Sequence, residues 1–341
     1  MLYGVSCQWG LGPARPSRAR HDGPVVDERK KLRERLAALN RESLPGRSGA
    51  GRDAAGIRRK LRRDAGSRSS GSPEAITYRR DLPRSERPRQ RRRPVGDHVE
   101  LQEALGGVEA AAPQGGSAYV IAERLEERIV HGQRLSGAFR DALLRGGSPL
   151  RRRLGGVCEA DALRAEDVIF MDLETTGLGA TPLFLIGTMA WEDGLVVRQY
   201  FARDYSEEPA ALSLFLEEAA RRRLLVTFNG KSFDVPYVRV RAAATGTPFR
   251  LALAHFDLLY ECRRAWGEVL PDCRLQTLES RMCGRPRHED IPGSEIPAAY
   301  HAFVRSGNAA EIVRILRHNM LDLVTMAELM TKLPEPGPAA R

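Results

Sequence analysis

The sequence predicts an α/β protein whose core is a mixed five-stranded sheet with helices on both faces, preceded by a disordered basic segment. In the C-terminal half, short apolar runs rich in strand-forming residues alternate with longer segments of helical periodicity. Strands joined by a short glycine turn are expected to pair antiparallel, and strands separated by a helix to pair parallel. Both kinds of connection occur here, so the sheet is expected to be mixed.

The expected elements begin at residue 168 and fill a region large enough for one hydrophobic core. The turn at Asp193 and Gly194 predicts that the strands before and after it form an antiparallel pair. Strands are expected at residues 168–173, 183–191, 195–203, 224–228 and 249–254, and helices at 207–223, 233–245 and 311–330.

The positive charge of the chain is confined to its N-terminal part. The net charge is +10; residues 1–100 hold 25 basic and 12 acidic residues, whereas residues 101–341 hold 29 and 32. Residues 1–98 are also poor in aromatics and rich in Gly, Pro and Ser, so we expect them to be disordered. Such a tail can bind nucleic acid weakly through phosphates. A GC-rich coding bias or a start codon placed too far upstream is the alternative explanation.

The remainder of the chain is expected to divide into three parts. Residues 99–166 form an extension that packs on the core, with a strand leading into a short helix at 118–129 and a further helix at 135–144. Residues 167–333 form the core domain and residues 334–341 a tail. The extension contains no catalytic motif, so the candidate chemistry lies in the core domain.

The cysteines and the hydropathy pattern indicate the compartment. The scattered cysteines show no C-x-x-C pair or Cys/His ligand spacing, which argues against a zinc ribbon. An odd number of thiols favours a reducing compartment over a disulfide framework. No leader pattern and no stretch of about 18 apolar residues is present. We therefore expect a cytoplasmic protein without a membrane partner, and the oligomeric state stays open. The cysteines are Cys7, Cys158, Cys262, Cys273 and Cys283.

Three acidic motifs in the core domain predict a metal site. The first expected strand carries Asp172 and Glu174, whose i,i+2 spacing places both side chains on one face. Asp234 lies just past the end of a second buried strand, and His318 and Asp322 lie one turn apart on a helix. Mg²⁺ and Mn²⁺ take oxygen ligands, so these carboxylates are candidate ligands. For Asp172 and Glu174 taken alone, a solvated strand end is the alternative.

These motifs resemble those of the DEDD superfamily of 3'-5' exonucleases. Asp172-x-Glu174, Asn229-x-x-x-Phe233-Asp234 and His318-x-x-x-Asp322 occur in the order and approximate spacing of that superfamily. The sequence around these motifs is most similar to that of the YprB-type ribonuclease H-like domain. One departure is that the histidine stands four residues before the last aspartate, which is the spacing of the tyrosine subgroup. The similar segments are HFDLL at 255–259, CRLQTLE at 273–279, EDIPGSEIP at 289–297 and HNMLD at 318–322.

The resemblance implies a ribonuclease H-like fold and a metal-dependent 3'-5' exonuclease acting on single-stranded ends of DNA or RNA with two Mg²⁺ or Mn²⁺ ions. Asp172 would bridge both ions, Glu174 and Asp322 would complete the site of the nucleophilic water, and Asp234 would hold the second ion. His318 would orient or deprotonate that water. The alternative for His318 is a histidine hydrogen-bonded into the domain interior. For the whole protein, the alternatives are a nucleic-acid-binding protein that cleaves weakly or not at all, and an interaction scaffold.

Residues beside the acidic motifs are candidates for substrate binding. A turn at Asn229 and Gly230 would permit close approach to a sugar or phosphate, although this dipeptide is also an ordinary turn. Lys231 is the only lysine between residues 61 and 331, and it either contacts a phosphate or is a solvated turn lysine, which is favoured. The full candidate set is Thr175, Asn229, Gly230, Lys231 and Phe233.

Further polar residues have two interpretations each. His255 and Asp257 follow the last expected strand and could approach the same sheet edge, but an N-cap is the favoured role of Asp257. Arg285, Arg287 and His288 either contact substrate phosphates or carry ordinary surface charge. No residue identifies a contact to a 2'-hydroxyl, so the sequence does not distinguish DNA from RNA.

Overall fold

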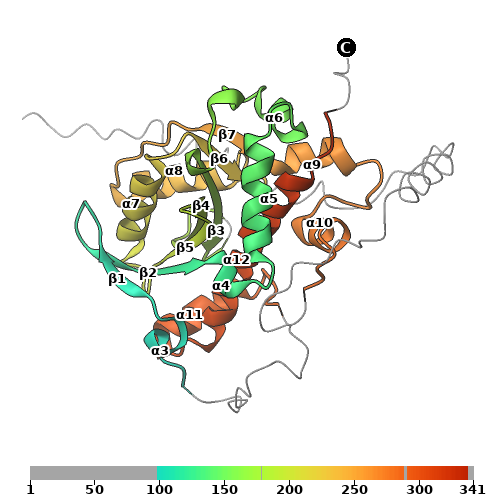
Figure 1. Cartoon of the computed structure of the whole chain (residues 1–341). Helices are drawn as coiled ribbons and strands as arrows, with labels where there is room; N and C mark the ends of the chain where they lie inside the picture. Colours follow the sequence, from blue (N-terminus) through green and yellow to red (C-terminus); the bar gives the residue numbers. More distant parts are fainter. Residues whose placement is uncertain (1–97, 178, 288–289, 337–341) are drawn as a thin grey trace, which may run out of the picture. The chain divides into compact units, whose positions relative to one another are not determined.

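The computed structural model describes residues 98–177, 179–287 and 290–336, which include a seven-stranded sheet in the order β1-β2-β5-β4-β3-β6-β7 (Figure 1). Most of the expected disordered segment, Cys7, His288 and residues 337–341 lie outside the described residues. Over the described part of the chain, no helix is both long and apolar enough to cross a membrane.

The five expected strands form one side and the centre of this sheet. β3 (Val168–Thr175) pairs antiparallel with β4 (Leu183–Trp191), which pairs antiparallel with β5 (Leu195–Phe201). On the other side, β3 pairs in parallel with β6 (Leu224–Thr227), and β6 with β7 (Ala254–Asp257). The expected mixed α/β fold is therefore confirmed.

Two strands of the extension enlarge the sheet from the expected five strands to seven. β1 (Val108–Ala111) pairs antiparallel with β2 (Ser117–Arg124), which pairs antiparallel with β5. The sequence pattern predicted β2 but not β1. No residue of β1 is buried, so this edge strand leaves no alternating hydrophobic signal in the sequence.

The last strand of the sheet begins later than expected. β7 starts at Ala254, whereas the sequence predicted a strand over residues 249–254. Phe249 and Leu251 pack, partly buried, against an apolar cluster of the core without pairing to β6. The hydrophobicity of Phe249 and Leu251 thus reflects packing against the core and not strand pairing. Because β7 runs from Ala254 to Asp257, His255 and Asp257 lie within this strand, whereas the sequence predicted that they follow it.

Helices cover both faces of the sheet, as expected (Figure 1). One face is covered by α7 (Glu208–Ala219) and α8 (Asp234–Thr245), and the other by α5 (Gly132–Leu144), α9 (Leu258–Trp266) and α12 (Ala310–Lys332). Within the described residues, the other helices are α3 (Leu101–Leu105), α4 (Leu125–Arg128), α6 (Pro149–Leu154), α10 (Leu275–Met282), α11 (Ile296–Ser306) and the 3₁₀ turns Ala160–Ala162 and Ala165–Asp167.

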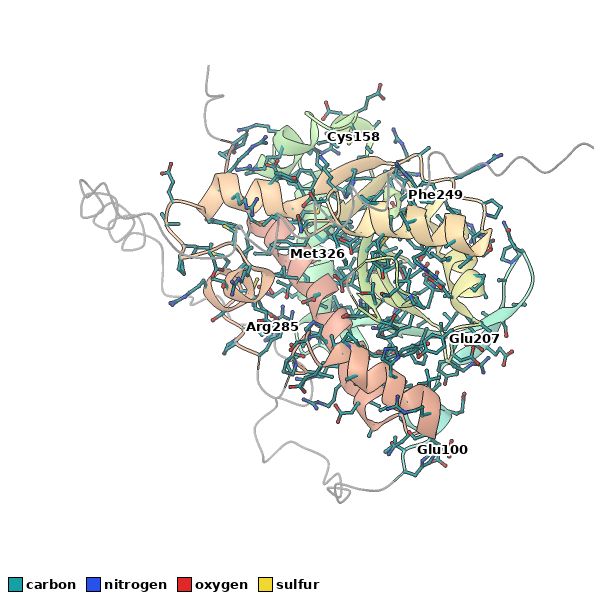
Figure 2. The ribbon with its side chains drawn as sticks, turned by 180° about the vertical axis from the view of Figure 1, so that it is seen from behind. Glu100, Cys158, Glu207, Phe249, Arg285 and Met326 are labelled. Carbon is teal, nitrogen blue, oxygen red and sulfur yellow. The ribbon has the colours of Figure 1, made fainter. Side chains whose placement is uncertain are left out.

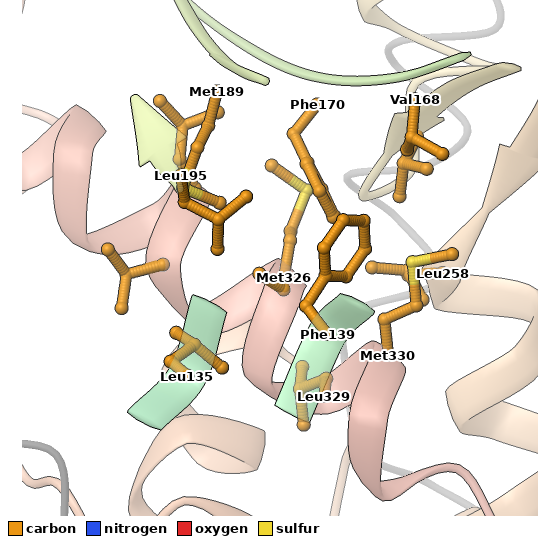
Figure 3. Packing of buried hydrophobic residues seen from close by; sticks show 14 of the residues in the cluster. Leu135, Phe139, Val168, Phe170, Met189, Leu195, Leu258, Met326, Leu329 and Met330 are labelled. Carbon is orange, nitrogen blue, oxygen red and sulfur yellow. The ribbon is translucent and has the colours of Figure 1, made fainter. Parts of the chain in front are cut away.

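The largest part of the core lies between the sheet and the helices α5 and α12. Phe170 of β3 packs on Phe139 of α5, with ring centroids 5.5 Å apart. Met326 and Met330 of α12 belong to the same cluster, and Figure 3 shows them beside these rings. The packing of α12 against β3 fixes the position of the helix that carries His318.

The alternation of β3 determines which face receives its carboxylates. Val168 and Phe170 belong to the cluster beneath α5 and α12, whereas Ile169 belongs to the cluster beneath α7 and α8. Because every second residue of a strand faces the same way, Asp172 and Glu174 continue the row of Val168 and Phe170. They therefore face α12 at the C-terminal end of β3.

Candidate active site

Four carboxylates from three separate motifs approach one another at one edge of the sheet. Asp172 and Glu174 come from β3, Asp234 from the first turn of α8, and Asp322 from α12. Asp172 and Glu174 both lie close enough to Asp234 and Asp322 for the charges to interact. The structure thus brings together the acidic residues that the sequence singled out.

Burial and mutual repulsion raise the pKa values of three of these carboxyl groups, those of Asp172, Glu174 and Asp234. Burial raises the pKa of Asp172 well above its usual range, and the charges of Asp322, Glu174 and Asp234 raise it further. Burial also raises the pKa of Glu174 to about 8 and that of Asp234 to about 7. A bound cation would relieve this repulsion and favour the charged form of each carboxylate.

The donor set suits a hard divalent cation, although it does not form a closed cage. All four candidate ligands are carboxylates, which Mg²⁺ and Mn²⁺ favour. Across residues 98–177, 179–287 and 290–336, no group of three or more His, Cys, Asp or Glu side chains is arranged to hold a metal ion.

One of the four carboxylates, Asp322, forms an ion pair with a buried arginine, Arg287. The Arg287 side chain is 6% exposed, and its guanidinium forms ion pairs with Asp322, Glu279 and Asp290, the last at 3.1 Å. Arg287 was expected either to contact substrate phosphates or to carry surface charge. The expectation of ordinary surface charge is wrong, because the guanidinium is buried and its donors are directed to three carboxylates of the chain.

Arg285 is buried in the same way. Its Nε lies 2.9 Å from Glu279 Oε1, and its Nη2 donates to Thr325 Oγ1 of α12 at 2.7 Å. Figure 2 marks Arg285 beside α12, which also carries the labelled Met326. Arg285 therefore joins the segment before α11 to α12 and does not carry ordinary surface charge.

His318 lies between two acidic side chains. Its Nδ1 is 2.8 Å from Asp290 Oδ2, and its Nε2 is 3.5 Å from Asp322 Oδ2. Burial alone lowers the pKa of His318, but the hydrogen bond with Asp290 and the charges of Asp322 and Glu174 outweigh it, so the pKa is raised. The sequence pattern did not predict Asp290 as a partner of His318. Its only signal was its place in the EDIPG turn.

Asn319 is a second residue that the sequence analysis missed. Its side chain is fully buried, and its Nδ2 donates to Asp172 Oδ2 at 2.8 Å and to the Asp172 carbonyl oxygen at 3.2 Å. A buried amide requires hydrogen-bond partners. An asparagine beside the apolar stripe of α12 was therefore a usable signal, and the structure shows that its partner is a candidate metal ligand.

The loop between β6 and α8 is held in place by Asp257. Asp257 accepts hydrogen bonds from the backbone N–H of Asn229 at 2.8 Å and of Lys231 at 3.0 Å. It also caps α9 by accepting from Leu259 N at 3.1 Å, which confirms the expected N-cap. Asn229 has a φ of 67°, as expected for a residue in a tight turn. The loop before Asp234 is thus fixed to the end of β7.

The other candidate substrate residues lie near this loop and at the end of β3. A Cβ on Gly230 would lie 2.3 Å from Thr227 Oγ1, so the loop packs tightly there. Thr175 donates from Oγ1 to the Gly177 carbonyl at 3.0 Å, and the Phe233 ring packs against Tyr237.

His255 has a structural role. Its Nε2 lies 2.8 Å from Thr227 Oγ1, and burial lowers the pKa of His255 to about 4. His255 is therefore neutral near physiological pH, with its Nε2 bonded to the neighbouring strand.

The raised pKa values predict how the stability of the metal-free protein depends on pH. Carboxyl groups of an unfolded chain titrate near pH 4, whereas Asp234 and Glu174 titrate at about 7 and about 8 in the folded state. The folded state then holds more protons, so its stability falls as the pH rises across this window, and the raised pKa of His318 acts in the same direction. Melting temperatures of metal-free protein should fall between about pH 5 and about pH 8.5, and Mn²⁺ should reverse the loss. A melting temperature that rises between about pH 5 and about pH 8.5 would contradict the raised pKa values of these side chains.

Comparison with known proteins identifies the domain. A family model described as RNase_H superfamily matches residues 169–334, which contain all four carboxylates and His318. This region is a ribonuclease H-like domain. The chain is 32% identical over 182 residues to the uncharacterized protein YprB of Bacillus subtilis (strain 168), so the expected YprB-type ribonuclease H-like domain is confirmed. The match covers 52% of this chain and 44% of YprB, which is less than half the length of that relative.

Part of the chain is also similar to part of a solved structure. A family B DNA polymerase from the hyperthermophilic archaeon Pyrobaculum calidifontis matches with a TM-score of 0.42 and 19% identity. That match covers 49% of this chain and 24% of the polymerase chain.

Proposed function

We propose that this protein is a 3'-5' exonuclease that hydrolyses phosphodiester bonds at single-stranded ends of DNA or RNA with two Mg²⁺ or Mn²⁺ ions. The observation that carries this proposal is the approach of Asp172, Glu174, Asp234 and Asp322 at one edge of a ribonuclease H-like sheet, with His318 beside Asp322. Four carboxylates balance the charge of two divalent cations. Their repulsion in the metal-free protein supports cation binding at this place.

The roles of the side chains follow from this arrangement. Asp172, Glu174, Asp234 and Asp322 would hold the ions, which when bound would stabilise the attacking and leaving oxygens at phosphorus. Asp290 accepts a hydrogen bond from His318 Nδ1–H, so the lone pair of the neutral ring is on Nε2, which lies 3.5 Å from Asp322 Oδ2. His318 can then take a proton from the attacking water at Nε2.

A nucleic-acid-binding protein of the same fold that cleaves weakly or not at all is the second candidate function. The observation in its favour is the ion pair between Arg287 and Asp322, because a guanidinium on a ligand oxygen competes with a cation.

Degradation of end-labelled oligonucleotides distinguishes the two candidates. Single-stranded DNA and RNA labelled at the 5' end should shorten stepwise from the 3' end with Mg²⁺ or Mn²⁺ and stay intact with EDTA. A substrate labelled at the 3' end should release labelled mononucleotide from the start. Binding without shortening in either metal would favour the second candidate, and internal cleavage would contradict the exonuclease assignment.

We assign the substrate strand to the loop that leads to Asp234. Lys231 is exposed, and its Nζ lies 6.0 Å from the ring centroid of Tyr260 on α9. Tyr260 is 41% exposed, and its hydroxyl lies 3.5 Å from Ser232 Oγ. An exposed aromatic ring can stack on a base, and a neighbouring lysine can contact a phosphate. This supports a single-stranded substrate, because the bases of a duplex are already stacked.

Substitution of Tyr260 tests this assignment. Loss of one stacked base costs about 1–3 kcal/mol, so Tyr260→Ala should weaken the binding of a single-stranded oligonucleotide about 5- to 150-fold, whereas Tyr260→Phe should retain it. Tyr205→Ala is the matched control, since Tyr205 is 44% exposed and contacts His301 of α11 instead. Fluorescence anisotropy in EDTA measures binding without cleavage. Equal affinities of the Tyr260→Ala and Tyr205→Ala proteins would contradict the assignment.

A further inference from the structure

Three cross-strand neighbours form a row beneath α12. Asp172 of β3 lies opposite Gly187 of β4, which lies opposite Gln199 of β5. Directly opposed residues of adjacent strands share one face of a sheet. The side chains of Asp172 and Gln199 therefore flank a position that has no side chain. With strands about 4.8 Å apart, these two polar residues are separated by roughly 10 Å, too far for a direct hydrogen bond.

The amide of Asn319 occupies the space above Gly187. A Cβ at Gly187 would lie 1.9 Å from Asn319 Oδ1 and 2.6 Å from its Cγ. Gly187 is not among the glycines with a positive φ, so its backbone conformation is open to other residues. The close approach of Asn319 is thus the reason that glycine is required at this position.

The side-chain amide of Asn319 forms hydrogen bonds with the residues at both ends of the row, Asp172 and Gln199. Nδ2 donates to Asp172 Oδ2 at 2.8 Å, and Oδ1 accepts from Gln199 Nε2 at 2.9 Å. Gln199 Nε2 also donates to the Leu316 carbonyl at 2.8 Å, which fixes the orientation of the glutamine amide. If the Asn319 amide were reversed, its oxygen would face the Asp172 carboxylate and its nitrogen would face Gln199 Nε2. Only the observed orientation satisfies both neighbours.

We propose that Asn319 is a positioning residue that fixes the Asp172 carboxylate for divalent-cation binding, and that Gly187 is a glycine so that Asn319 can reach it. This inference rests on the proposed function of the same site. An amide that restricts a ligand carboxylate to one rotamer reduces the ordering that cation binding requires. Gln199 holds the amide from the opposite side.

Removal of the amide is the first arm of the test. Asn319→Ala should lower Mn²⁺ affinity about 10- to 100-fold, the usual cost of losing a group that orients a metal ligand. Asn319→Leu, which fills a similar volume without a donor, should show the same loss of affinity. Calorimetric Mn²⁺ titration measures the affinity, and thermal melting reports the stability of each variant separately. A fall in melting temperature with unchanged Mn²⁺ affinity would show a merely structural role and overturn the proposal.

Addition of a methyl group at Gly187 is the second arm. Gly187→Ala should lower both the melting temperature and the Mn²⁺ affinity, because the new Cβ overlaps the Asn319 amide. The double variant Gly187→Ala with Asn319→Ala should recover the melting temperature but not the affinity, since the methyl group then fills vacated space. Gly137→Ala is the control, as a Cβ at Gly137 of α5 would have no heavy atom within 4 Å.

The outcomes distinguish a failure of the proposed function from a failure of the positioning role of Asn319. If the wild-type protein binds no Mn²⁺, with or without a single-stranded oligonucleotide, both the proposed function and the cation-positioning role are overturned. If the wild type binds Mn²⁺ and Asn319→Ala binds it equally well, only the positioning role is overturned. Additive effects of the two substitutions on melting temperature would overturn the explanation of Gly187.

Discussion

Replacement of Asp172 by asparagine should abolish nuclease activity while leaving the fold intact and raising the melting temperature of the metal-free protein. The substitution keeps the shape of the side chain and removes one negative charge from four clustered carboxylates. Burial and these neighbours raise the pKa of Asp172 well above its usual range, so its ionised form is strained without a cation. Removal of a residue that hydrogen-bonds to a metal ligand already lowers metal affinity or activity about 10–100-fold. Removal of a metal-ligating carboxylate itself should therefore lower activity more than about 100-fold.

Three measurements on wild type and Asp172→Asn check this prediction: a nuclease assay, thermal melting in EDTA near pH 8, and calorimetric Mn²⁺ titration. Asp141→Asn is the matched control, since the Asp141 side chain is 62% exposed on α5. It should change none of the three. Wild-type cleavage by Asp172→Asn would show that the chemistry lies elsewhere. Loss of activity together with unfolding would remove the distinction between catalytic and structural roles on which the prediction depends.

Replacement of His318 by alanine should slow turnover about 10²- to 10⁴-fold while substrate binding and metal binding are retained, because general-base catalysis contributes that much. Asp290→Asn should reduce the rate less, by about 10–100-fold, since it changes the group that orients the imidazole. Asp290 also raises the pKa of His318. Its neutralisation should therefore move the acid limb of the pH–rate profile to lower pH.

The matching measurement is single-turnover cleavage across a pH series at saturating metal, where chemistry limits the rate. An unchanged rate for His318→Ala would mean that metal activation of the water suffices and that His318 is a structural histidine. If Asp290→Asn leaves the pH–rate profile unchanged or moves its acid limb to higher pH, the contact with Asp290 is not the source of the raised pKa of His318.

The sequence predicted the candidate ligands because their geometry is local. Two residues apart on a strand, Asp172 and Glu174 must share a face, and four residues apart on a helix, His318 and Asp322 must lie on one side. Whether Asp234 meets them depends on the position of β6 beside β3, a long-range property. Only the resemblance to a family anticipated that convergence.

The partners of the site residues could not be predicted, because they depend on contacts across long stretches of chain. Asn319 lies 147 residues from Asp172 in the sequence, and no local pattern pairs them. Arg287 was expected either to contact substrate phosphates or to carry ordinary surface charge. Its burial depends on Glu279, Asp290 and Asp322 surrounding one guanidinium, which requires the assembled fold.

The central claim is that the carboxylate cluster binds two divalent cations, and the stoichiometry of Mn²⁺ binding tests it most directly. Wild-type protein should be titrated calorimetrically at about pH 8, above the pKa of Asp234 at about 7 and close to that of Glu174 at about 8. A cleavage-resistant single-stranded oligonucleotide should be present. We expect two Mn²⁺ ions per chain in the wild type and reduced, weaker binding in Asp172→Asn. One ion per chain, or none, in the wild type would contradict the two-metal account.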